Sequence, residues 1–126
     1  MGKLKRLFTN HNETRDDHRD ESLKSHYYKT SQKKAMEAVK EMIEQMDGYT
    51  ITSISEERGE MSIKGKKSFI VATVISVRPF ETSVDFSATT NTLLLPIDFG
   101  ASHKLITTLY QTLDRKLPFI HAGGSQ

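Results

Sequence analysis

The chain has 126 residues, of which 36% are hydrophobic and 27% are charged, and its formal net charge is +2. This length suits one domain and is too short for two self-supporting ones. The longest apolar stretch, residues 69–77, is too short to cross a bilayer, which excludes a membrane-spanning protein. Nucleic-acid binding is also disfavoured, because the net charge is small and the lysine clusters lack interleaved aromatic residues.

The first 22 residues are expected to form a flexible tail. Residues 9–22 contain no aliphatic or aromatic side chain, so nothing there can be buried to offset the entropy of ordering. Residues 1–8 are basic and apolar, and at most they support weak, peripheral contact with a membrane or a partner. The side chains that would make this contact are Lys3, Leu4, Leu7 and Phe8. No apolar run of secretory length follows the basic residues, so we expect a cytoplasmic protein.

A helix is the first strong pattern in the chain, and a short aromatic segment at residues 24–29 predicts an edge strand before it. Thr30 or Ser31 supplies an N-cap oxygen, and Gly48 provides a C-terminal stop. Apolar residues recur between them at helical spacing. These residues are Ala35, Ala38, Val39, Met42, Ile43 and Met46.

After Gly48 the apolar period changes from 3.6 to 2, which predicts four strands joined by short turns. The predicted strands are residues 49–57, 60–64, 68–77 and 82–90. A two-residue loop at 58–59 would pair Ile54 with Ile63. The third turn contains Pro79, whose missing N–H costs nothing there.

The third and fourth strands have a predicted register that fixes their faces. A four-residue connection over residues 78–81 pairs Ile75 with Val84 and Thr73 with Phe86. One face, the expected core, then holds Val71, Ile75, Val77, Val84 and Phe86. The other face is mixed and open, and it holds Ile70, Ala72 and Val74 beside Ser83, Asp85 and Ser87.

A second helix is predicted from about residue 100 or 101 to Lys116, capped by Asp98 or Ser102 and ended by Pro118. Strands grouped between flanking helices predict an α+β fold, in which an antiparallel meander of four to five strands carries two helices on one face as a two-layer sandwich. We expect a single domain over residues 23–120 and a frayed C-terminus over residues 121–126.

No catalytic, metal or cofactor site is expected. The chain has no cysteine, and it lacks the nucleophile-elbow, P-loop, zinc and dinucleotide motifs. His11 and His18 lie in the predicted tail, where no surrounding structure would fix them as metal ligands. A non-enzymatic module is therefore favoured over an enzyme.

Several short motifs resemble a family of small cytosolic proteins of spore-forming Gram-positive bacteria, a family without an established activity. The similarity covers about residues 23–118. It rests on residues 27–31 (YYKTS), 55–60 (SEERGE), 77–80 (VRPF), 84–87 (VDFS) and 96–100 (PIDFG). The resemblance implies a bacterial cytosolic setting and assigns no catalytic or binding residue.

Two kinds of binding surface follow from the predicted fold. The first is the mixed sheet face with Ile70, Val74 and Asp85, or a sheet edge, which would meet another protein or a second copy of the chain. The alternative is a ligand-binding or enzymatic pocket between helices and sheet. Its candidate residues are Tyr27, Tyr28, Asp85 and Arg78, the last as a counter-charge for Asp85.

Overall fold

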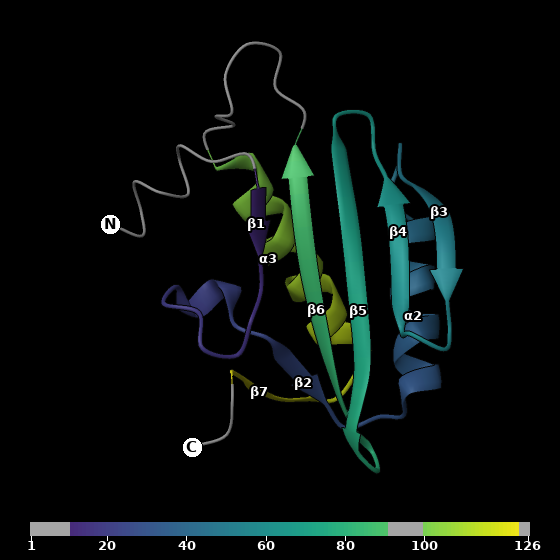
Figure 1. Cartoon of the computed structure of the whole chain (residues 1–126), viewed down its shortest axis with the longest axis vertical. Coiled ribbons are helices and arrows are strands. Elements are labelled where there is room, and N and C mark those ends of the chain that lie inside the picture. The colour runs from purple at the N-terminus through teal and green to yellow at the C-terminus, as the bar shows by residue number, and fades with distance from the viewer. Residues whose placement is uncertain (1–10, 91–99, 124–126) are drawn as a thin grey trace.

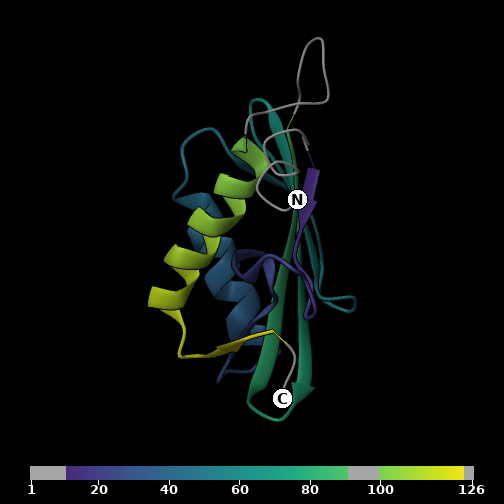
Figure 2. The same cartoon turned by 90° about the vertical axis from the view of Figure 1, so that its left-hand side faces the viewer.

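Two helices pack on one face of a seven-stranded antiparallel sheet (Figures 1 and 2). The computed structural model describes residues 11–90 and 100–123. Its elements are β1 (His11–Glu13), the 3-10 helix η1 (Glu21–Leu23), β2 (His26–Tyr28), α2 (Gln32–Glu44), β3 (Thr50–Ser55), β4 (Glu60–Lys64), β5 (Ser68–Arg78), β6 (Glu81–Thr90), α3 (Ala101–Lys116) and β7 (Phe119–Ala122). The predicted α+β sandwich is confirmed, with more strands than expected.

The sheet has the order β3-β4-β5-β6-β2-β7, and β1 pairs with the same edge of β6 as β2 does. The predicted edge strand, β2, is therefore an inner strand, paired on both sides. The face opposite the helices, hereafter the outer face, is not covered by either described helix (Figure 2).

The two helices form where the apolar stripes predict them. Ser31 is the N-cap of α2, and its hydroxyl accepts the Lys34 N–H at 3.2 Å. α3 begins after Gly100, whose φ of +87° suits glycine. Ser102, one of the two predicted caps, instead accepts a hydrogen bond from Asn12 Nδ2 at 2.8 Å, and Asp98 lies outside the described residues. Both stripes face the sheet, and their fully buried members are Ala35, Val39, Ile43, Ile106 and Leu113.

The predicted register of β5 against β6 is wrong by one residue. Val74 lies opposite Val84, and Asp85 lies opposite Thr73. The shift arises at an irregularity between Ser76 and Arg78, which adds one residue to β5. Because side chains alternate along a strand, this one step reverses the faces of β5. The core therefore contains the residues predicted to be exposed, Ile70, Ala72 and Val74, all with 0% exposure.

The hairpin of β3 and β4 also differs from its prediction. Its loop spans residues 56–59 rather than two residues, so Ile54 lies opposite Met61 instead of Ile63. The close approach of this loop to β5 depends on Gly59. Its φ is +69°, and a side chain there would collide with the Val74 carbonyl.

Residues 11–22 are part of the fold, which corrects the prediction of a flexible tail. β1 pairs with residues 87–89 of β6, and the following loop is closed by hydrogen bonds of the Arg15 backbone with Leu23 and Ser25. η1 places Leu23 in the core with 1% exposure. Backbone pairing and hydroxyl contacts hold this polar segment, and neither leaves an apolar signature in the sequence.

The C-terminal segment is ordered further than predicted. β7 pairs with β2 through His121 opposite Tyr27 and Ala122 opposite His26. Gly123 continues the contact by donating its N–H to the Ser25 carbonyl at 2.7 Å. Among the described residues, no helix has the length and apolar character needed to cross a membrane.

Candidate functional site

The predicted interaction face does not exist in its predicted form. Ile70 and Val74 are fully buried between the sheet and the helices, so they cannot contact a partner. Arg78 is exposed and lies 3.7 Å from Glu81, its neighbour across the turn. It therefore does not serve as the counter-charge of Asp85, which lies further along β6. Lys3, Leu4, Leu7 and Phe8 lie outside the described residues.

Tyr28 is a core residue and not a ligand contact. Its side chain is fully buried, and its hydroxyl donates to Asp114 Oδ1 at 2.7 Å. The same carboxylate lies 2.9 Å from His26 Nδ1, and the His26 ring stacks on Tyr110 at 3.6 Å. Burial, together with the hydrogen bond to Asp114, raises the pKa of Tyr28. These contacts tie β2 to α3 and leave the Tyr28 hydroxyl no free position for a ligand.

Tyr27 lies on the outer face, with an exposure of 8%. Its hydroxyl donates to the Asp16 carboxylate, with distances of 2.6 and 2.7 Å to the two oxygens. Its ring stacks on His121 with centroids 4.6 Å apart. Burial and the hydrogen bond to Asp16 raise the pKa of Tyr27, so the hydroxyl stays protonated at neutral pH. This arrangement makes Tyr27 a neutral donor that holds the loop after β1, and not a general base.

Asp85 lies where β6 passes the gap between β1 and β2. Its Oδ1 accepts hydrogen bonds from the hydroxyls of Thr14, at 2.6 Å, and Ser25. Burial raises the pKa of Asp85, and the two hydroxyl donors lower it only in part. Asp85 therefore joins the two ends of the loop over residues 15–24 to β6, which is a structural role.

Asp85→Asn is expected to become more stable relative to the wild type as the pH rises from about 4 to 7. A carboxyl group with a raised pKa binds its proton more tightly in the folded state than in the unfolded chain, so its contribution to stability falls as the pH rises above the unfolded value of about 3.9. The amide of asparagine can accept the same two hydrogen bonds and does not titrate. Urea unfolding of both proteins at pH 4 and pH 7 measures this difference. A variant that loses more stability at pH 7 than at pH 4 would contradict it.

A serine, a histidine and an aspartate meet where η1 contacts α3. His103 Nε2 lies 2.8 Å from Ser22 Oγ and 3.1 Å from Asp20 Oδ2. A hydrolytic triad needs the serine and the acid on opposite ring nitrogens, whereas here both are on Nε2. Burial raises the pKa of Asp20, but hydrogen bonds from Ser22 and the nearby His103 outweigh it and lower that pKa overall. The cluster fixes η1 to α3 and does not activate a nucleophile.

The turn between β5 and β6 displays the most exposed large apolar side chain among the described residues. Phe80 is 70% exposed and has φ +59°, a left-handed conformation that is unusual for a bulky side chain. Ile75 and Val77 on β5 are 40% and 44% exposed. Strand β7 reaches the same level of the sheet, because Phe119 lies opposite Tyr28, which lies opposite Thr82.

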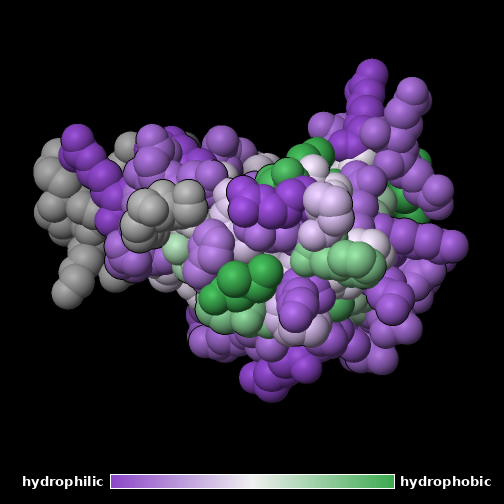
Figure 3. Space-filling model, turned by 90° about the horizontal axis from the view of Figure 1, so that it is seen from below, coloured by the Kyte–Doolittle hydropathy of each residue, from purple (hydrophilic) through white to green (hydrophobic). Residues whose placement is uncertain are grey.

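We call the exposed apolar side chains at this end of β5 and in the turn after it the hairpin end; they are Ile75, Val77 and Phe80. Phe119 and Ile120 of β7 are also exposed, but the Phe119 ring lies on the helix side of the sheet, against His26 and Tyr28. Figure 3, viewed from this end, shows apolar patches among hydrophilic side chains. The sequence analysis missed the hairpin end because Val77 was assigned to the core and only Pro79 was considered in the turn. The signal that could have found it is phenylalanine directly after the proline of a tight turn, a position that often requires positive φ.

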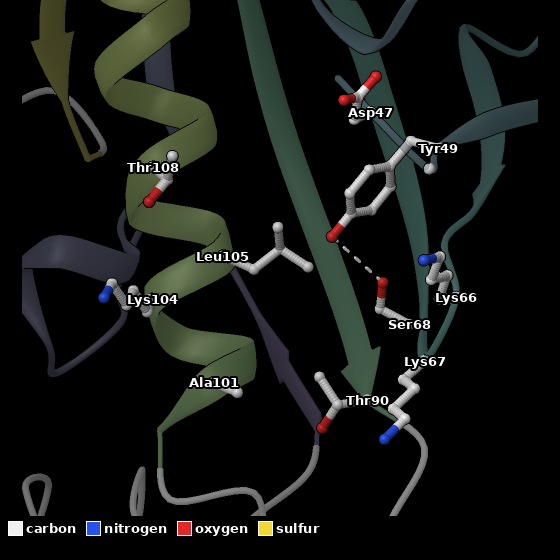
Figure 4. A pocket seen from close by; sticks show the side chains of 11 residues that line it. Asp47, Tyr49, Lys66, Lys67, Ser68, Thr90, Ala101, Lys104, Leu105 and Thr108 are labelled. Atoms are coloured by element: carbon white, nitrogen blue, oxygen red, sulfur yellow. Dashed lines mark hydrogen bonds between the residues drawn. The ribbon is translucent and has the colours of Figure 1, made fainter.

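A cavity of about 820 Å³ opens at the other end of the sheet. It lies between the first two turns of α3 and the strand ends facing them (Figure 4). Its lining residues are Asp47, Gly48, Tyr49, Lys66, Lys67, Ser68, Thr90, Ala101, Lys104, Leu105 and Thr108. None of the four residues proposed for a pocket between helices and sheet, Tyr27, Tyr28, Arg78 and Asp85, lines this cavity.

Comparison with known protein families, with curated proteins and with solved structures finds no match for this chain. In the two described ranges, no group of three or more histidine, aspartate or glutamate side chains is placed to hold a metal ion.

Proposed function

We propose that the protein is a non-enzymatic interaction module that associates with a second copy of itself through the hairpin end. The observation that carries this proposal is Phe80, which is 70% exposed at a position with φ +59°. A left-handed conformation costs a non-glycine residue on the order of 1–3 kcal/mol, and exposure of the ring gives nothing back in the isolated chain. A strained, exposed aromatic residue at the tip of the longest hairpin is best explained by a contact that buries it.

Charge at the hairpin end supports a second copy as the partner. Arg78 and Glu81 flank the Pro79–Phe80 turn and carry opposite charges. In a two-fold arrangement, the same patch meets itself, so Arg78 of one copy can face Glu81 of the other while Phe80 packs on apolar side chains. Few side chains take part, which places the interface among weak, transient ones.

The proposal also places this module in the cytoplasm of a bacterium. Its support is the resemblance of the short motifs, including VRPF at the hairpin end and VDFS on β6, to small cytosolic proteins of Gram-positive spore formers. A module without catalytic motifs agrees with the structural roles of Asp85, Tyr27 and His103.

Sedimentation velocity of the wild type and of Phe80→Gly tests the proposal. We expect the wild-type sedimentation coefficient to rise with concentration, with a dissociation constant on the order of 100 µM to 1 mM. Phe80→Gly should remain monomeric over the same range. Its free energy of unfolding should stay the same or rise by about 1 kcal/mol, because glycine relieves the left-handed strain at some cost in chain entropy.

Phe69→Ser provides the matched control. Phe69 is also on β5 and is 45% exposed, but it lies at the opposite end of the strand. Its replacement should leave association unchanged. A wild type that stays monomeric up to about 1 mM would overturn the proposal, and so would association that survives in Phe80→Gly.

A further inference from the structure

We propose that the cavity beside α3 binds an amphipathic organic anion, with its apolar body between Leu105 and Tyr49 and its charged head on Lys66 and Lys67. The cavity volume of about 820 Å³ falls within the range of small-molecule sites, about 300–1,000 Å³. The cavity and the hairpin end lie at opposite ends of the sheet, so this inference is independent of the proposed self-association.

The apolar walls come from two sides of the opening. Leu105 points from α3 toward the ring of Tyr49, which comes from the start of β3 (Figure 4). Leu105 and Tyr49 are both partly buried against the core. A methylene chain or an aromatic ring placed between them would remove apolar surface on both sides from water.

The lysine pair of the cavity lies on its sheet side. Lys66 and Lys67 belong to the turn between β4 and β5, next to Ser68, whose hydroxyl donates to the Tyr49 oxygen at 3.4 Å (Figure 4). Lys104 lines the rim, but its side chain turns away from the opening. The anion-binding pair is therefore Lys66 and Lys67.

The positive charge on the sheet side of the cavity indicates which class of ligand it would bind. Neither Lys66 nor Lys67 forms an ion pair with any residue in the described ranges, since none of the salt bridges there involves them. Asp47 is the one acidic residue in the described lining, against three lysines. Two ammonium groups without partners beside an apolar wall fit a carboxylate, sulfonate or phosphate attached to a hydrocarbon body.

Isothermal titration calorimetry of the full chain with decanoate and with decanol tests this inference. Decanol has the same chain length without the charge, so the pair separates the head from the body. The wild type should bind decanoate at least about tenfold more tightly than decanol, because hydrogen bonds to charged groups contribute more than neutral ones. The double variant K66E/K67E should lose this preference.

Two further variants complete the experiment. K33E/K34E makes the same change of net charge at another adjacent lysine pair, at the start of α2, and should bind decanoate like the wild type. Leu105→Asn should weaken both ligands by a similar factor, because it removes the apolar wall. No binding of decanoate up to about 1 mM, an affinity unchanged in K66E/K67E, or an equal loss in K33E/K34E would overturn the proposal. K66E/K67E changes only turn residues, so the result stands even if Leu105→Asn does not fold.

Discussion

Val74→Lys is expected to unfold the domain or to lower its free energy of unfolding by about 4 kcal/mol or more. Val74 has 0% exposure on the helix-facing side of β5, opposite Val84. An ammonium group placed there would have neither water nor a carboxylate around it, and burying an unpaired charge is among the most destabilising changes known. Folded domains of this size are stable by only about 5–15 kcal/mol, so one such charge removes much of the margin.

Ile75→Lys, one position along the same strand, should change stability by less than about 1 kcal/mol. Ile75 is 40% exposed on the outer face, where a lysine can extend into water. Thermal and urea unfolding of the two variants, measured side by side, tests the register of β5 against β6 directly. If Val74→Lys were tolerated and Ile75→Lys unfolded the chain, the register of β5 against β6 would be the one predicted from the sequence.

The sequence predicted α2, α3 and the four meander strands β3 to β6 because each of these elements has a strong local signal. The apolar stripes of α2 and α3 and the alternation of the four meander strands depend only on near neighbours along the chain. Ser31, the observed cap, was one of the two predicted cap residues, because side-chain capping is local as well. Fold class follows from the order of such elements, and it was predicted correctly.

Register could not be predicted, because β5 is apolar on both faces. Ile70, Ala72 and Val74 make one plausible core face, and Val71, Ile75 and Val77 make another. The turn lies at Pro79 as predicted, but its loop is Pro79–Phe80 instead of residues 78–81, and the irregularity between Ser76 and Arg78 shifts every pair beyond it. A bulge of one residue has no sequence signature here, and its consequence is to exchange the two faces.

The error in this register also explains why the predicted interaction surface was wrong. The interface was predicted on the face of β5 that packs against the helices, so Ile70 and Val74 are core residues. The cavity at Lys66 and Lys67 arises from the place where α3 returns to the sheet, a long-range feature that no local pattern shows. In the sequence these lysines form only one of the clusters that lack interleaved aromatic residues.

Thr14→Val is expected to destabilise the protein by about 2–4 kcal/mol, although Thr14 lies in a segment whose composition predicts a flexible tail. Its hydroxyl donates to Asp85 and accepts the Phe86 N–H at 2.9 Å. The Tyr110 hydroxyl lies 3.1 Å from the same oxygen. Valine has nearly the same shape, so the loss would come from a buried N–H without an acceptor and a buried carboxylate with one donor fewer.

Thr14→Ser keeps the hydroxyl and should recover most of this loss, which separates hydrogen bonding from packing. Urea unfolding at pH 7 gives both free energies on one scale. The comparison decides whether the first strand belongs to the domain, because a residue in a solvated tether contributes nothing to unfolding whether or not it has a hydroxyl. Equal stability of wild type and Thr14→Val would mean that residues 11–22 are a linker. The hydrogen bonds of Asp85 would then not hold β1 and β2 against β6.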